Sequence, residues 1–159
     1  MGVSGCGKSD VGQRLATALG VTFIEGDVWH SSENVAKMAA GIPLTDADRA
    51  GWLATLREKI AAARVAGETI VLSCSALKRR YRDLLRQGDP NLFFVELDGP
   101  RALIEQRMQA RTGHFMPASL LDSQFRDLEP LQPDESGLRV PVTGTVDDVT
   151  AAILQSIGR

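Results

Sequence analysis

A glycine-rich loop at the start of the chain has the residue types that phosphate binding requires. Residues 2–9 read Gly-Val-Ser-Gly-Cys-Gly-Lys-Ser, a complete match to the pattern G-x-x-x-x-G-K-[ST]. Glycines let successive backbone N–H groups point at phosphate oxygens, and the helix that follows presents its positive end to the same anion. Lys8 would reach the β- and γ-phosphates as a catalytic residue, and the Ser9 hydroxyl would ligate Mg²⁺. The predicted nucleotide-binding residues are Gly2, Ser4, Gly5, Cys6, Gly7, Lys8, Ser9 and Asp10.

Two acids, Glu25 and Asp27, follow a short apolar run and suit phosphoryl transfer. In open α/β sheets, ligands bind beyond the carboxyl ends of the strands. Because residues one apart on an extended segment point to opposite faces, we expect one acid to order Mg²⁺ and the other to accept a proton from the attacking hydroxyl. We assign the metal to Glu25 with Ser9 and the proton to Asp27, with His30 contacting the substrate. A solvated acidic turn and a structural histidine are the alternatives.

Two pairs of basic residues at helical spacing are candidates for binding anions. Lys78 and Arg82 share one helix face, just after small residues that follow an apolar run. Arg107 and Arg111 share another face, shortly before a glycine. Phosphoryl transfer needs cations that close over the β- and γ-phosphates while water is excluded, so Arg107 and Arg111 are predicted to be catalytic. Solvated helix faces are the alternative for both pairs.

The elements that must position these residues follow an α/β pattern. Apolar runs that read as strands, the last at an edge because of Pro141, cover 21–24, 69–73, 92–97 and 138–142. Helical patterns cover about 8–19, 46–66, 76–87, 100–111, 117–128 and 145–157. We therefore predict a doubly wound parallel sheet in a single domain over residues 1–159.

The composition argues against nucleic-acid and membrane partners. The formal net charge is −2, from 18 basic and 20 acidic residues, whereas a whole-surface nucleic-acid binder has a marked basic excess. No apolar run approaches the ~20 residues that span a bilayer, and no secretion signal is seen. The two cysteines, Cys6 and Cys74, lack metal-ligand spacing. We therefore expect a cytoplasmic protein with a small-molecule substrate.

With these clusters in view, the chain resembles the gluconokinases of the small, adenylate-kinase-like type over nearly its whole length. The resemblance rests on the glycine-rich loop, on Gly26-Asp27, and on later segments that are more specific than the loop. These include Cys-Ser-Ala-Leu-Lys at 74–78 and Gly-His-Phe-Met at 113–116. The resemblance implies a P-loop fold similar to shikimate and nucleoside monophosphate kinases, with a mobile lid at about 111–117.

The same resemblance implies ATP-dependent phosphorylation of D-gluconate to 6-phosphogluconate, with Mg²⁺, by a homodimer. Cations would bind the carboxylate of an anionic polyol, while polar side chains would bond its hydroxyls. The implied substrate-binding residues are Asp27, His30, Asn34, Arg49, Ser75, Lys78, Arg82 and His114. Two positions depart from the family pattern, because Cys6 stands where serine is common and Glu25 where related kinases often have aspartate.

Two other functions stay open at this point. One is shikimate kinase or another kinase of a small acid, and the other is a switch that binds ATP without phosphorylating a metabolite. The short chain and the cluster of polar residues beyond its sheet favour an enzyme over a switch.

The start of the chain raises a further expectation. A P-loop is normally preceded by a buried strand, yet only Met1 precedes Gly2. In related kinases this strand is central, between the runs at 69–73 and 92–97. Its absence would leave a gap of roughly 10 Å, two strand spacings, with two rows of unpaired backbone groups. We therefore expect the functional protein to have about five or more apolar residues upstream of Met1.

Overall fold

Four short parallel strands lie at the centre of the protein. The structure is a computed structural model, and it describes residues 1–111 and 117–158. β1 pairs with β2, with Thr22 opposite Ile70, and β3 pairs with β4, with Phe94 opposite Gly137. The strands are β1 (Thr22–Glu25), β2 (Ile70–Ser73), β3 (Phe94–Asp98) and β4 (Gly137–Pro141). The predicted α/β class with parallel strands is confirmed, and the four strand positions agree within two residues.

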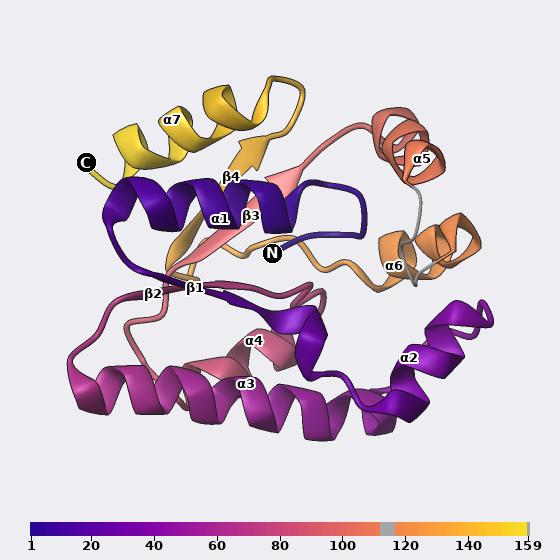
Figure 1. Ribbon diagram of the computed structural model, residues 1–159, viewed down its shortest axis with the longest axis horizontal. Helices are drawn as coiled ribbons and strands as arrows, with labels where there is room; N and C mark the ends of the chain where they lie inside the picture. The colour runs from indigo at the N-terminus through magenta and orange to yellow at the C-terminus, as the bar shows by residue number, and fades with distance from the viewer. Residues whose placement is uncertain (112–116, 159) are drawn as a thin grey trace.

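Helices cover both sides of the strands (Figure 1). α1 (Lys8–Leu19) and α7 (Val146–Ser156) pack together on one side, and α3 (Asp46–Ala66) and α4 (Arg79–Arg86) pack together on the other. The other helices lie on the right of Figure 1, towards the carboxyl ends of the strands. They are α2 (Ser32–Ala39), α5 (Arg101–Ala110), α6 (Leu121–Asp127) and the 3₁₀ turns η1 (Gly26–Trp29) and η2 (Ala118–Leu120). This is the edge at which α/β proteins bind ligands.

Local sequence signals explain where α3 and α7 begin. Thr45 and Thr145 each cap a helix, accepting from the backbone of a residue three positions on, Asp48 or Asp148. The aspartate side chain accepts in return from the backbone N–H of the threonine, which completes a capping box. The predicted start of α3 at Asp46 and the capped start of the last helix at Thr145 are therefore confirmed.

The sequence prediction misses one helix and merges two others. α2 was not predicted, although Ser31 caps it by accepting from the Asn34 N–H. A serine before a short amphipathic stretch was the available signal. The predicted helix at 117–128 divides into η2 and α6, and the one at 76–87 begins only at Arg79.

The strands separate the two larger clusters of the hydrophobic core. One cluster lies among α1, α5, α7 and the β3–β4 pair, with Ile104 and Ile153 fully buried. The second lies between α3 and α4 and the strands, around Leu56 and Leu85. The two strand pairs are also separate sheets in the described residues, and the Met1 backbone lies between β2 and β3. The strand pairs are thus separated between β2 and β3, where the sequence led us to expect a gap in the doubly wound sheet.

Candidate active site

The glycine-rich loop has a backbone that only glycine tolerates at its critical points. Gly5 and Gly7 have φ angles of 81° and 95°, in the left-handed region. A Cβ atom on Gly5 would lie 2.8 Å from Cγ of Met108, so the loop could not pack there with a side chain. Gly7 is also the N-cap of α1 and supplies no side-chain hydrogen bond to the helix. The first N–H groups of α1 are therefore directed at the place where an anion would bind.

Lys8 lies within this loop. Its Nζ atom donates to the carbonyl oxygen of Val3 at 2.9 Å, which holds the ammonium over the loop. Lys8 also lines a small pocket that contains Asp27 and His30. The lysine thus lines the same pocket as the acid predicted to accept the proton.

Glu25 and Ser9, the predicted metal ligands, are in contact. The Ser9 hydroxyl donates to one oxygen of the Glu25 carboxylate, and the Ser73 hydroxyl donates to the other. Ser73 was not among the predicted site residues; it ends the strand next to Glu25 and lies opposite it in register. Hydroxyl and carboxylate oxygens are hard ligands that suit Mg²⁺. In the ranges 1–111 and 117–158, no group of three or more His, Cys, Asp or Glu side chains could hold a metal.

Asp27 has different surroundings from Glu25. It lies in the turn η1, where its backbone N–H is 3.4 Å from Oε1 of Glu25, and it lines the small pocket beside the loop. The same pocket collects several of the predicted substrate ligands. Its full lining is Ser4, Lys8, Asp27, His30, Met38, Pro43, Leu44, Arg49, Trp52, Ser75, Leu120, Ser123 and Gln124.

His30 is held in the pocket by an aromatic stack. Its ring lies 4.1 Å from the Trp52 ring, with 18° between the planes, and Trp52 donates to the Gly26 carbonyl oxygen at 2.8 Å. Burial lowers the pKa of His30, opposed by the charge of Asp27 and assisted by that of Arg49. His30 is therefore neutral near pH 7 and has one nitrogen that accepts a hydrogen bond. Sequence reasoning did not identify Trp52 as its support.

Arg49 supplies a cation to the same pocket. It is a buried residue whose Nη1 lies 3.0 Å from the Tyr81 hydroxyl and 3.6 Å from the Asp127 carboxylate. Within residues 1–111 and 117–158 both of these contacts are made by Nη1, so the other N–H groups of the guanidinium can donate to an anion.

The prediction that Arg82 binds the substrate is wrong. Its side chain is fully buried, and Nε and Nη2 each donate to Glu135 at 2.7 Å. Nη1 donates to the carbonyl oxygens of Ala76 and Glu129 at 3.1 and 3.0 Å. The guanidinium therefore joins α4 to the segment before β4 and has no donor directed at the pocket.

Two further predicted ligands lie beside the pocket and not in its lining. Lys78 pairs with Asp46 at 3.3 Å and lies 4.0 Å from Asp127. The buried Asn34 donates to the Asp48 carbonyl oxygen at 2.8 Å, which joins α2 to α3. His114 and the centre of the predicted lid lie outside the described residues.

Arg107 and Arg111 meet the glycine-rich loop across a second cleft of about 400 Å³. Arg107 donates to the Val142 carbonyl oxygen at 2.7 Å, so the segment after β4 positions it. The remaining lining is Gly5, Cys6, Gly7, Asp10, Val11, Ala110, Val142, Gly144, Thr145, Val146 and Val149. The cleft thus joins the predicted arginine pair to the predicted nucleotide residues.

Parallel strands, a glycine-rich loop before a helix, and an acid and two arginines around it define a P-loop kinase, which uses ATP. A family model described as an AAA domain matches residues 1–131. The thermosensitive gluconokinase of Escherichia coli K12 is 44% identical over 99% of this chain and 84% of its own length. The chain belongs to the gluconokinase family.

Solved structures agree with this assignment. A sugar kinase from Janibacter sp. HTCC2649 superposes with a TM-score of 0.94 at 47% identity, covering 99% of this chain and 91% of the other. A gluconokinase from Sinorhizobium meliloti 1021 has a TM-score of 0.87 at 44% identity, covering 100% and 89%. In the part of this chain that the structure describes, no helix has the length and apolarity to cross a membrane.

Proposed function

We propose that the protein transfers the γ-phosphate of ATP to D-gluconate and forms 6-phosphogluconate. The observation that carries the proposal is the small pocket beside the glycine-rich loop, in which Lys8, Asp27, His30 and Arg49 converge. A cation, a carboxylate and a neutral imidazole fit an anionic polyol, and the family membership supports gluconate as that polyol.

The chemistry assigns one task to each group. The loop N–H groups and Lys8 bind the β- and γ-phosphates, and Arg107 and Arg111 stabilise the charge that develops on them. A gluconate hydroxyl oxygen attacks the γ-phosphorus, the bond to the β-phosphate oxygen breaks, and ADP leaves. Asp27 takes the hydroxyl proton. Mg²⁺ bound near Ser9 and Glu25 would neutralise phosphate charge.

The substrate is oriented by the rest of the pocket. Arg49 pairs with the gluconate carboxylate, while His30 and Ser75 bond hydroxyl groups. Trp52 keeps the imidazole plane fixed, and Arg49 is fixed by Tyr81. Fixed ligands reduce the entropy lost when a flexible polyol binds.

We also propose a domain organisation, a cellular location and an oligomeric state. Residues 1–159 would act as a single kinase domain with a lid at about 111–117, in a cytoplasmic homodimer without nucleic-acid or membrane partners. Both cysteines are free and buried, which supports a reducing compartment. Sedimentation velocity of the purified protein, with and without nucleotide, tests the dimer.

A coupled assay of ADP release tests the proposed reaction. Gluconate, shikimate and nucleoside monophosphates are compared at equal concentration with a reaction that lacks an acceptor. We expect gluconate to give the highest kcat/KM by at least about tenfold, because only its carboxylate and chain hydroxyls match the pocket. Faster turnover with shikimate would indicate that the substrate is shikimate or another small acid and not gluconate. ADP release independent of any acceptor would indicate a switch.

A further inference from the structure

A buried hydrogen bond joins the glycine-rich loop to α6. The backbone N–H of Ser4 donates to Oε1 of Gln124 at 2.6 Å, although the two residues are 120 positions apart in the sequence. Both residues are buried. Because a buried N–H group is costly to leave without an acceptor, this bond holds the loop backbone at a defined position relative to α6.

The bond lies where the two parts of the proposed active site meet. Ser4 and Gln124 both line the small pocket that contains Asp27. The next residue of the loop, Gly5, lines the cleft that also contains the predicted arginine pair. A change in the orientation of the Ser4 peptide is therefore felt on the nucleotide side of the loop as well as in the small pocket.

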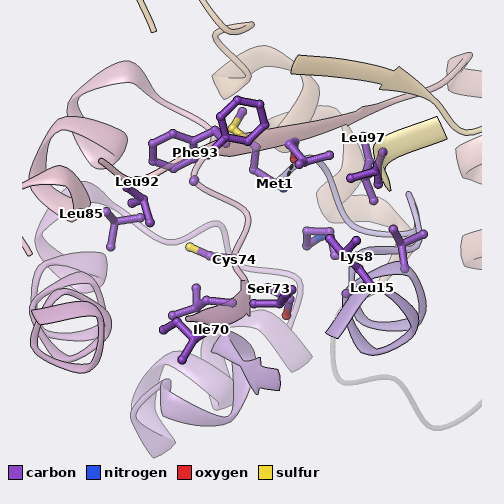
Figure 2. A pocket seen from close by; sticks show the side chains of 18 of the residues that line it. Met1, Lys8, Leu15, Ile70, Ser73, Cys74, Leu85, Leu92, Phe93 and Leu97 are labelled. Atoms are coloured by element: carbon purple, nitrogen blue, oxygen red, sulfur yellow. Dashed lines mark hydrogen bonds between the residues drawn. The ribbon is translucent and has the colours of Figure 1, made fainter. Parts of the chain in front are cut away.

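A different kind of surface borders the loop at the centre of the protein, where a cavity of about 240 Å³ separates β2 from β3. Figure 2 shows Lys8 at one side of this cavity, with Ile70, Leu85 and Leu97 among the residues around it. Contacts with apolar walls have no preferred direction, whereas a hydrogen bond does. Gln124 does not line this cavity and is a directional contact, so it is suited to orienting the loop.

The same helix contacts the cation that we assign to the substrate carboxylate. Asp127 lies 3.6 Å from Nη1 of Arg49. Asp127 follows Gln124 by three positions in α6, and residues at this spacing are neighbours on a helix surface. One region of α6 therefore contacts both the glycine-rich loop and the substrate arginine, so a shift of this helix displaces both contacts together.

The small pocket must widen when gluconate enters. Its volume is about 30 Å³, which is room for no more than a few water molecules and less than gluconate requires. A ligand that widens the pocket displaces part of its wall, to which Ser4, Ser123 and Gln124 belong. The hydrogen bond between Gln124 and Ser4 carries such a displacement into the glycine-rich loop.

We propose that Gln124 is a positioning residue, which orients the glycine-rich loop through the Ser4 N–H in response to gluconate in the pocket. This inference rests on the proposed function. Gluconate and ATP then bind with positive coupling, because the first ligand places α6 and the loop in the arrangement that the second requires. The coupling is reciprocal, so each ligand tightens the binding of the other by the same factor.

Calorimetry of gluconate and of a non-hydrolysable ATP analogue, each alone and each with the other at saturation, tests the coupling. Gln124→Met keeps the length of the side chain and removes the amide acceptor. The control is Asp122→Asn, an exposed residue of the same helix that pairs with Arg101. We expect the wild type and the control to bind gluconate at least about fivefold more tightly with the analogue present. In Gln124→Met this factor should fall to about one, while gluconate alone and the analogue alone bind with nearly unchanged affinity.

A second measurement uses the wild type alone. Gly5, Cys6 and Gly7 do not line the small pocket, so a ligand confined to that pocket reaches their amides only through the loop. We expect gluconate without nucleotide to slow the hydrogen exchange of these amides by at least about fivefold.

Several results would overturn the proposal and leave the proposed function intact. They are gluconate binding to the wild type with a coupling factor of one, unchanged exchange of the loop amides, and undiminished coupling in Gln124→Met. Weaker gluconate binding in Gln124→Met with the coupling preserved would make Gln124 a substrate ligand and not a positioning residue. A wild type that binds no gluconate, with or without the analogue, would instead contradict the proposed function itself.

Discussion

At the scale of single residues, the two acids at the carboxyl end of β1 have separate surroundings. Glu25 accepts from the hydroxyls of Ser9 and Ser73, next to the loop. Asp27 instead lines the pocket with His30. The turn η1 produces this division, because it begins at Gly26, between the two acids. A Cβ on Gly26 would lie 2.1 Å from the Ser73 carbonyl oxygen, so only glycine allows this approach.

Asp27→Asn should lower kcat by about 10²- to 10⁴-fold, because the amide keeps the shape and cannot accept the proton. ATP binding should be unchanged, since Asp27 does not line the cleft formed by the loop and the arginines. The matched control is Asp147→Asn, which removes an exposed carboxylate paired with Arg14. Steady-state kinetics measure both variants, and wild-type kcat in Asp27→Asn would exclude the role.

His30 should make stability depend on pH. Burial lowers its pKa in the folded protein, so the unfolded chain binds the proton more tightly and acid favours unfolding. The stabilising effect of the neutral ring is complete above the ordinary histidine pKa of about 6.5 and is lost as the pH falls below it. Urea unfolding between pH 7.5 and about 5 should show a decline that His30→Gln reduces. An identical slope in the variant would contradict this expectation.

At the scale of elements, the Arg82 side chain joins α4 to the segment before β4. It does not line the pocket that contains Asp27. Breaking a buried ion pair costs about 3–5 kcal/mol when one charge is left behind. Arg82→Met should lower the free energy of unfolding by about 3 kcal/mol, the lower end of this range, because Arg86 still contacts Glu135 at 2.6 Å. The exposed Arg80→Met is the control and should change stability by less than about 1 kcal/mol.

Urea unfolding measures the two free energies, and KM for gluconate is measured on the folded fraction. An unchanged stability with a raised KM in Arg82→Met would restore the role in substrate binding.

The helix α5 and the residue that ends it place Arg107 and Arg111 on the nucleotide cleft. Lysine has no planar fork, so Arg107→Lys and Arg111→Lys should each lower kcat by at least about tenfold. Arg101→Lys on the same helix is the control, since Arg101 pairs with Glu105 on the surface. Full activity in both test variants, measured with saturating gluconate, would show that the two arginines are surface charges without a catalytic role.

At the scale of the whole molecule, the nucleotide site joins distant segments and should couple binding to folding. A non-hydrolysable ATP analogue at about 100 times its Kd should add roughly 2.7 kcal/mol to the free energy of unfolding. This corresponds to a rise of about 5–11 °C in Tm. Lys8→Ala should lose most of the rise while its Tm without ligand changes little, because alanine removes one hydrogen bond, to the Val3 carbonyl oxygen. Differential scanning fluorimetry compares the two, and an equal rise in both would contradict the role of Lys8.

The sequence alone determined the features that depend on neighbours along the chain. The glycine-rich loop, the start of α3 at Asp46 and the four strand positions are local patterns, and each is present as expected or within two residues. Strand alternation predicted separate roles for Glu25 and Asp27, but the turn η1 is what separates the two acids, and their roles in catalysis stay a prediction.

Only the tertiary structure decided which element covers each face. Helical spacing placed Lys78 and Arg82 on one face of a helix. Arg82 is nevertheless buried, because it pairs with Glu135 from a distant segment of the chain. Likewise, Ser73 reaches Glu25 only because β1 and β2 are paired in register, and Trp52 reaches His30 only because α3 packs on η1. Periodicity specifies which residues share a face, whereas their partners depend on contacts between residues far apart in the chain.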